Sequence, residues 1–112
     1  MPRIRRKPDV QAQIGRMVNR IVKRFHPEKV ILFGSQARGE AGPDSDVDLL
    51  VVMPVEGSIP EKRLEIALAL PDTPLPVDVI VTTPEDLAWR KDIVGTIEWP
   101  ATRDGKVLFA RT

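Results

Sequence analysis

Apolar residues recur three and four positions apart between Val10 and Phe25, a spacing that places them on one face of a helix. This pattern predicts a helix over Val10–Phe25. We expect the helix to end near His26, because Pro27 disfavours the helical conformation in the residue before it. The buried face is predicted to consist of Ile14, Met17, Val18, Ile21, Val22 and Phe25.

Four short segments rich in β-branched and other apolar residues predict strands. They are residues 30–33, 47–53, 77–81 and 106–110. Gly34 closes the first of these strands, and residues 42–45 supply a turn before the second.

Three further helices are predicted between the strands. Residues 35–41 form a short one with Ser35 as its cap, and Pro60 begins the second. Residues 83–86 are a helix start for the third, which continues over residues 87–98. Their buried residues are predicted to be Leu64, Ala67, Leu68 and Leu70 in the second helix and Leu87, Ile93, Val94 and Ile97 in the third. This order of helices and strands defines an α/β or α+β domain.

The length of 112 residues suits one domain, so we expect residues 1–112 to form a single unit in which residues 1–9 are a flexible basic tail. Seventeen basic and sixteen acidic residues give a net charge of +1, too balanced for non-specific binding of nucleic acid. The basic cluster between Arg3 and Lys7 is interpreted as solvated, the alternative being contact with RNA or an acidic partner.

The absence of cysteine from the sequence excludes a thiolate metal site and a thiol nucleophile. A metal ion would have to be held by oxygen atoms or by His26, the one histidine. The longest apolar run, residues 49–53, is far shorter than the roughly 20 residues that cross a membrane. We therefore expect a soluble, cytoplasmic protein whose candidate ligands are carboxylates.

Gly34 and Ser35 stand where the first predicted strand leads into a helix, a place where α/β proteins commonly receive ligands. Glycine lets the backbone approach an anion closely, and the serine hydroxyl and the amides of a helix start can donate hydrogen bonds to phosphate oxygens. A plain strand-to-helix turn would use the same two residues. The pair therefore indicates a phosphate site only in combination with the acidic residues later in the chain.

Three aspartates are the candidates for metal binding. Asp46 and Asp48 stand at the start of the second strand, on one face and roughly 7 Å apart, because side chains alternate along a strand. Asp78 lies inside the third predicted strand, where a buried carboxylate is costly unless it is paired or coordinated. If the two strands are neighbours, the three carboxylates converge and suit Mg²⁺ or Mn²⁺. The alternative is that Asp46 and Asp48 are exposed residues at a strand entrance.

Gly34-Ser35, ten further residues, Asp46-Val47-Asp48 and then Asp78 on a later strand form one joint pattern. This pattern resembles the G-S-x10-D-x-D signature of the polymerase beta-type nucleotidyltransferases. Residues 33–49 are similar in detail to the minimal nucleotidyltransferases, short prokaryotic members that are encoded beside HEPN-domain proteins. The resemblance implies a nucleotidyltransferase fold, with a mixed sheet of about four strands and helices mainly on one face.

The resemblance also implies roles for individual residues. Contacts with the phosphates of ATP or another nucleoside triphosphate are assigned to Gly34, Ser35 and Arg38. Catalysis and the binding of Mg²⁺ or Mn²⁺ are assigned to Asp46, Asp48 and Asp78. A surface salt bridge is the alternative role of Arg38.

The implied reaction is the transfer of a nucleoside monophosphate, AMP from ATP, onto a hydroxyl of a partner protein, since so small a domain offers no evident pocket for a second substrate. The implied partner is a HEPN-domain protein, with which the chain would assemble as a toxin–antitoxin pair. Two alternatives stay open: an antitoxin that only binds and masks its partner, and transfer to a small hydroxylated molecule such as an aminoglycoside. We expect no membrane or nucleic-acid partner.

Overall fold

The computed structural model describes residues 9–40, 42, 45–72 and 75–111. The basic cluster between Arg3 and Lys7, the predicted tail up to residue 8 and positions 43 and 44 of the predicted turn lie outside these ranges. No helix in the described ranges combines the length and the apolar character that crossing a bilayer requires. The elements in chain order are α1 (Val10–Phe25), β1 (Lys29–Phe33), α2 (Ser35–Arg38), β2 (Val47–Val52), α3 (Ile59–Ala69), β3 (Val77–Thr82), α4 (Pro84–Arg90), α5 (Glu98–Asp104) and β4 (Lys106–Ala110).

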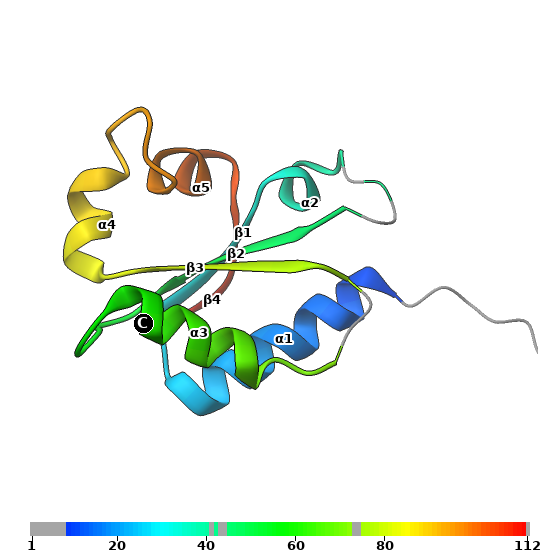
Figure 1. Cartoon of the computed structure of the whole chain (residues 1–112). Helices are drawn as coiled ribbons and strands as arrows, with labels where there is room; N and C mark the ends of the chain where they lie inside the picture. The colour runs from blue at the N-terminus through cyan, green and yellow to red at the C-terminus, as the bar shows by residue number, and fades with distance from the viewer. Residues whose placement is uncertain (1–8, 41, 43–44, 73–74, 112) are drawn as a thin grey trace, which may run out of the picture.

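The four strands form one mixed sheet in the order β3-β2-β1-β4 (Figure 1). Strand β1 is antiparallel to both of its neighbours, β2 and β4, whereas β2 and β3 are parallel and are connected through α3. A parallel pair needs such a crossover, because a tight hairpin can join only antiparallel strands. The predicted α+β class and the mixed four-stranded sheet are confirmed.

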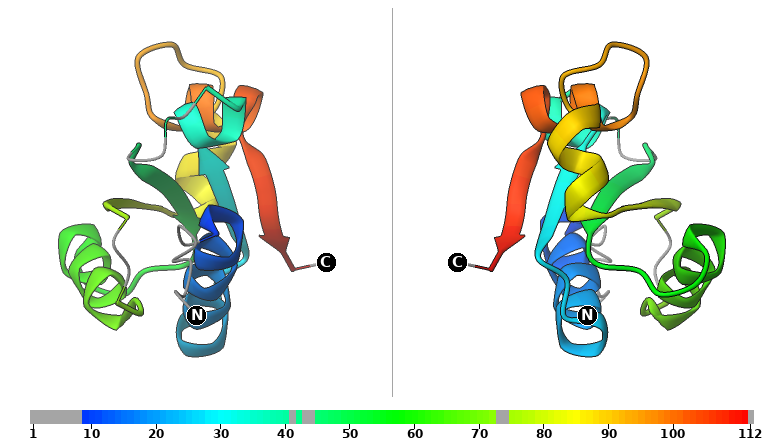
Figure 2. Two further views of the ribbon diagram at one scale, coloured as in Figure 1. Left: turned by 90° about the vertical axis from the view of Figure 1, so that its right-hand side faces the viewer. Right: turned by 90° about the vertical axis from the view of Figure 1, so that its left-hand side faces the viewer.

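Helices cover both faces of the sheet, and the two longest lie on the same face. Figures 1 and 2 show α1 and α3 on one side and α4 and α5 on the other. The larger core, under α1 and α3, includes Met17, Ile21, Val30, Leu32, Leu49, Val51 and Ile66. The smaller core, under α4 and α5, consists of Ile31, Leu50, Val52 and Ala101. Because the central strands β1 and β2 are buried on both faces, they are almost continuously apolar.

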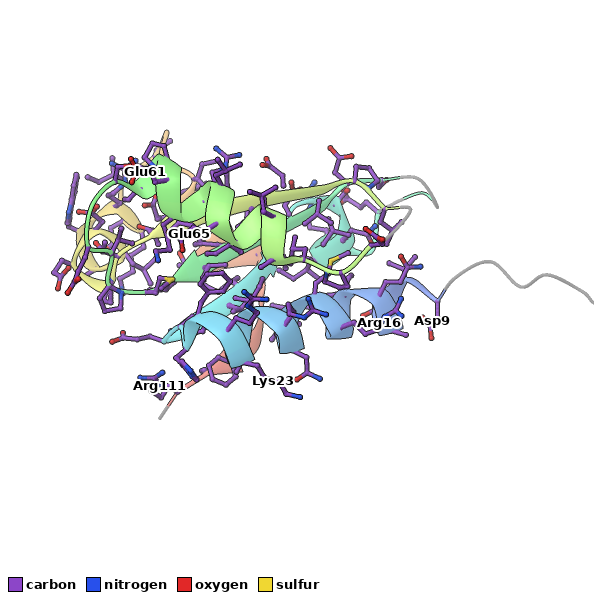
Figure 3. All side chains as sticks on the ribbon, turned by 60° about the horizontal axis from the view of Figure 1, so that its bottom comes forward. Asp9, Arg16, Lys23, Glu61, Glu65 and Arg111 are labelled. Carbon is purple, nitrogen blue, oxygen red and sulfur yellow. The ribbon has the colours of Figure 1, made fainter. Side chains whose placement is uncertain are left out.

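Helix α1 begins and ends where the sequence predicts. The Asp9 side chain accepts a hydrogen bond from the amide of Gln11 (3.0 Å), which satisfies one of the unpaired donors of the first turn. His26 follows the helix in the left-handed conformation (φ 50°) and its amide bonds the carbonyl of Val22 (3.1 Å). The face of α1 that points away from the sheet is charged, and Figure 3 shows Arg16 and Lys23 on it.

The predicted buried face of α3 is wrong. Leu64 and Leu68 are 58% and 77% exposed, Ala67 is also exposed, and Ile66 is the residue that is fully buried. The helix has apolar residues on both of its sides, so its periodicity does not distinguish the face toward the sheet from the face toward solvent. Leu70, at the end of the helix, does pack against the core as expected.

The helix predicted from residues 83–86 onward begins as expected, since Thr83 caps α4 at Pro84. Its predicted continuation to residue 98 is wrong, because two short helices stand in place of one. Helix α4 ends at Arg90, and Gly95 adopts a positive φ of 102° that a continuous helix cannot contain. Ile93, Val94 and Ile97 of the expected apolar set are exposed. Helix α5 was not predicted from the sequence.

A buried carboxylate fixes α4 and α5 at the end of β3. The side chain of Glu98 accepts hydrogen bonds from the Thr82 hydroxyl (2.8 Å) and from Nε of Arg90 (2.9 Å). Glu98 is only 5% exposed, and burying its charge requires partners of this kind.

The two sides of α3 can be compared directly by truncation. Replacement of Ile66 by Ala is expected to lower the free energy of unfolding by about 2–4 kcal/mol, because it leaves a cavity in the larger core. Leu68→Ala is the matched control on the same helix and should change it by less than about 0.5 kcal/mol. Urea denaturation of both variants measures the difference. Equal losses would contradict the orientation of α3.

Candidate functional site

The chemistry-bearing residues meet at one edge of the sheet, where β1 ends and β2 and β3 begin. In the strand register, Phe33 at the end of β1 pairs with Asp48 on β2. Asp48 in turn pairs with Asp78 on the parallel strand β3. The two aspartates are therefore direct neighbours across the parallel pair, which is the condition for a shared site.

Gly34 brings the backbone into contact with the Asp48 carboxylate. Its conformation (φ 75°, ψ −157°) is one that is essentially restricted to glycine. A Cβ atom at position 34 would overlap with Oδ2 of Asp48, so a side chain is excluded for a second reason. The turn after β1 is thus shaped around the carboxylate.

Helix α2 continues from this turn, but Ser35 does not cap it as predicted. Gly34 is the residue at the cap position, and its carbonyl accepts hydrogen bonds from the amides of Ala37 (3.1 Å) and Arg38 (3.2 Å). The side-chain amide of Gln36 donates to the carbonyl of Ser45 (3.2 Å), which ties α2 to the segment just before β2. The first residues of α2 are therefore held beside the start of the strand that carries Asp48.

Electrostatics single out Asp48 among the three aspartates. Burial raises the pKa of its carboxyl group above the ordinary value, and the negative charges of Asp78 and then Asp46 raise this pKa further. The charge of Arg38 acts in the opposite direction and lowers it. Three carboxylates and one guanidinium are thus close enough to interact at this edge of the sheet, although Asp46 itself is exposed.

Asp78 is not a buried acid, contrary to the sequence-based expectation. Its side chain is 50% exposed, and Oδ1 accepts a hydrogen bond from Nη2 of Arg63 on α3 (2.5 Å). Arg63, which lies fifteen positions before Asp78, was not among the residues predicted for the site. No local pattern indicates the pairing, because it depends on how α3 crosses beside β3.

Arg38 makes the surface salt bridge that was its alternative role from the sequence. Its Nε lies 3.1 Å from Oε2 of Glu40, and both side chains are exposed. Such a pair contributes little to stability. Since the charge of Arg38 also acts on Asp48, the salt bridge does not separate the side chain from the site.

The donor set fits a hard divalent cation in its chemistry. Asp48 and Asp78 offer carboxylate oxygens from neighbouring positions. The pKa of Asp48 is raised first by burial and then by the charges of Asp78 and Asp46, and a bound cation would favour its charged form. Within the described ranges, no three His, Cys, Asp or Glu side chains are grouped closely enough to hold one ion. The carboxylate of Asp78 is instead engaged by Arg63.

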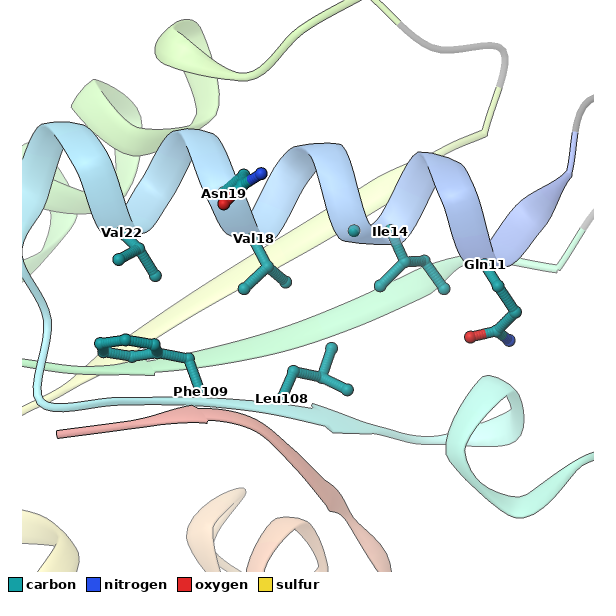
Figure 4. Close-up of a pocket in the computed structure, with 8 residues that line it drawn as sticks. Gln11, Ile14, Val18, Asn19, Val22, Leu108 and Phe109 are labelled. Carbon is teal, nitrogen blue, oxygen red and sulfur yellow. The ribbon is translucent and has the colours of Figure 1, made fainter. Parts of the chain in front are cut away.

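A groove elsewhere on the molecule lacks this chemistry. It lies between α1 and β4, has a volume of about 440 Å³ and is lined by apolar residues such as Val22 and Phe109, which face each other in Figure 4. Gln11 and Asn19 supply its polar groups, and no carboxylate lines it. The edge of the sheet around Asp48 is therefore the candidate active site.

The chain belongs to the nucleotidyltransferase domain family, whose model matches residues 15–100. The match covers most of the chain and includes every residue of the candidate site. The protein is thus a nucleotidyltransferase by family. No curated protein is a significant match to the sequence.

Two solved structures are similar in fold. One is a candidate nucleotidyltransferase from Sulfolobus solfataricus, with a TM-score of 0.60 and 22% identity over 91% of this chain and 86% of that one. The other is a toxin–antitoxin structure with AMP-PNP, with a TM-score of 0.53 and 20% identity over 92% of this chain and 75% of that one. At these identities the similarity concerns the fold alone.

The contact between Gly34 and Asp48 can be tested with a pair of glycine variants. Gly34→Ala should lower the free energy of unfolding by about 1–3 kcal/mol through backbone strain and should also displace the Asp48 carboxylate. Gly39→Ala is the control, because Gly39 has a similar φ of 73° but no atom within 4 Å of an added Cβ. Binding of a nucleoside triphosphate, measured by calorimetry, should be lost in the first variant and kept in the second. Equal binding by both would show that the contact is unimportant.

The raised pKa of Asp48 determines the sign of a pH effect. Between the ordinary pKa and the raised one, the folded state binds more protons than the unfolded state, so stability falls as pH rises through this interval. Asp48→Asn should therefore make the metal-free protein more stable at pH 7, with a gain that shrinks as pH falls towards about 3.9. Urea denaturation at several pH values measures the gain.

Asp78→Asn is the comparison variant for this effect. It removes a half-exposed ion pair and also a charge that repels Asp48, so we expect a change of less than about 1 kcal/mol. A loss of stability in Asp48→Asn at neutral pH would mean that a favourable partner, rather than burial, dominates the environment of this carboxylate.

Proposed function

We propose that the protein transfers a nucleoside monophosphate, AMP from ATP, onto a hydroxyl of a partner protein, and that the two proteins form a toxin–antitoxin pair. The observation that carries the proposal is the packing of Gly34 on the carboxylate of Asp48, which is itself in register with Asp78. This arrangement puts a side-chain-free stretch of backbone next to two acids. Such a combination suits a nucleotide that is bound through metal and phosphate.

Mg²⁺ or Mn²⁺ would be held by Asp46, Asp48 and Asp78 after their side chains move closer together, since the described residues include no three acids already grouped around one point. The bound cation supplies charge neutralisation at the phosphates and orients the triphosphate for displacement. The protein contributes the fixed strand register, which sets the spacing of Asp48 and Asp78 before any ligand binds. It also contributes the partial burial of Asp48, which strengthens electrostatic interactions at that carboxylate.

The phosphates would contact Gly34, Ser35 and Arg38. Gly34 lets the chain approach the anion closely, and the Ser35 hydroxyl can donate a hydrogen bond to a phosphate oxygen. Arg38 is exposed, and its partner Glu40 is also exposed, so the guanidinium can exchange this carboxylate for a phosphate at little cost.

In the proposed reaction the acceptor oxygen forms a bond to the α-phosphorus while the bond from the α-phosphorus to the bridging oxygen of pyrophosphate breaks. Pyrophosphate leaves with the electron pair of that bond. The acceptor hydroxyl gives its proton to the carboxylate of Asp78, which lies on the edge strand of the sheet and is half exposed. An acceptor from outside the chain can reach it there.

Two observations favour a partner protein and an adenine nucleotide. The similar toxin–antitoxin structure contains AMP-PNP, an analogue of ATP. The exposed side of α3 presents Leu64 and Leu68 on the helix that also carries Arg63, the residue that pairs with Asp78. Exposed apolar patches of this kind mark protein–protein contacts. A HEPN-domain protein is the partner that we propose.

The proposal predicts covalent modification of the partner. Incubation with ATP, Mg²⁺ and the product of the neighbouring gene should add one or more AMP units to that product, detected by intact mass measurement. Asp48→Asn should reduce the rate by at least about a hundredfold, because it removes a charged ligand of the metal. Lys62→Gln, a surface change on α3 that leaves the three aspartates intact, should retain activity and serves as the control.

Other outcomes would replace this function. If Asp48→Asn neutralises the partner as well as the wild type does, and the partner gains no mass, the protein is a binding antitoxin. If the partner is neither bound nor modified while an aminoglycoside or another small alcohol is adenylylated, the acceptor is a small molecule.

A further inference from the structure

The ion pair between Arg63 and Asp78 occupies an atom that the proposed function needs. Oδ1 of Asp78 accepts a hydrogen bond from Nη2 of Arg63 at 2.5 Å. A carboxylate oxygen engaged by a guanidinium is not free to coordinate a cation, and the two positive charges would repel each other at this range. Arg63 and a metal ion therefore compete for the same carboxylate.

The position of Arg63 allows it to leave. Its side chain is 47% exposed and that of Asp78 is 50% exposed, so the pair is partly solvated and can break at small cost. Arg63 also lines a groove on α3 of about 410 Å³, together with Ile59, Pro60, Leu64 and Ala67. The aliphatic part of the arginine can rest on these apolar residues while its charged end moves to solvent.

The pair also serves the metal-free state. Asp48 and Asp78 are neighbours across parallel strands, so their like charges repel each other. The guanidinium of Arg63 supplies a positive charge at the Asp78 end of this cluster. This single positive charge reduces the repulsion between the two carboxylates, as the double charge of a divalent cation would.

We propose that Arg63 is a positioning residue that holds Asp78 in the metal-free protein and must release it before a divalent cation can bind. This inference rests on the proposed function, since it takes Asp78 as a metal ligand. It adds a residue that neither the signature of glycine, serine and aspartates nor the family match assigns. In consequence, the metal affinity of the nucleotide-free protein is set partly by an arginine that touches no metal.

The test is the affinity of the nucleotide-free protein for Mn²⁺, measured by electron paramagnetic resonance of the free ion. Arg63→Gln should bind Mn²⁺ about three- to fivefold more tightly than the wild type, the factor that corresponds to losing a half-exposed competing pair. Arg63→Lys keeps a charge that can reach Asp78 and should restore affinity close to that of the wild type. Circular dichroism of each metal-free variant establishes that it is folded.

Lys62→Gln is the matched control for net charge. Lys62 precedes Arg63 on α3 but pairs with Glu65 (3.2 Å), so its removal lowers the charge of the helix without freeing Asp78. Mn²⁺ affinity in this variant should stay within about twofold of the wild type, because exposed charges beyond contact distance are largely screened.

Three outcomes would overturn the inference. Mn²⁺ affinity in Arg63→Gln that is equal to or weaker than that of the wild type would make the ion pair purely structural. Equal tightening in Lys62→Gln would reduce the effect to net charge. These two results leave the proposed function standing if the wild type still modifies its partner. Absence of Mn²⁺ binding by the wild type would instead remove the metal site itself, and with it both the proposed function and the role of Arg63.

Discussion

The pairing of β2 between β1 and β3 is the constraint on which the site depends. Phe33, Asp48 and Asp78 occupy one row across three strands, so the residue after Phe33 necessarily meets the carboxylate of Asp48. Because the side-chain period of a strand is two residues, a register slip of one position would turn Asp48 toward the larger core. The cost of burying its carboxylate among apolar residues opposes such a slip. The hydrophobic core therefore fixes the polar site.

This arrangement works against the stability of the metal-free protein. Burial and the neighbouring acids both disfavour the charged form of Asp48, and Gly34 holds a backbone conformation open to few other residues. The apolar residues buried in the core under α1 and α3 stabilise the fold and offset these unfavourable contributions to its stability. Arg63 and Arg38 offset part of the repulsion, since one pairs with Asp78 and the other lowers the pKa of Asp48. The remaining negative charge of the aspartates would therefore attract a cation before any triphosphate is bound.

The sequence predicts the parts of the fold that depend on local patterns. Helix α1 has one apolar face, a capping aspartate and a proline after its end, and its bounds are as expected. Strand β4 and the strands that carry Asp48 and Asp78 were also predicted, whereas the parallel pairing of the latter two was a condition that the structure supplies. The face of α3 was not, because its apolar residues lie on two sides, and α5 was missed because Gly95 was treated as a weak point in one helix rather than as a break. Arg63 could not be found locally, since its partner is set by a crossover.

Helix α3 connects parts of the molecule that are separate in the sequence. It joins the end of β2, the strand that carries Asp48, to the start of β3, the strand that carries Asp78, and it packs beside β3. One side of it buries Ile66 in the core, while the other exposes Leu64 and Leu68. Between these two sides stands Arg63, within reach of Asp78. Leu64 directly follows Arg63 in the chain, so a protein that bound this side of α3 would lie beside the arginine that pairs with Asp78.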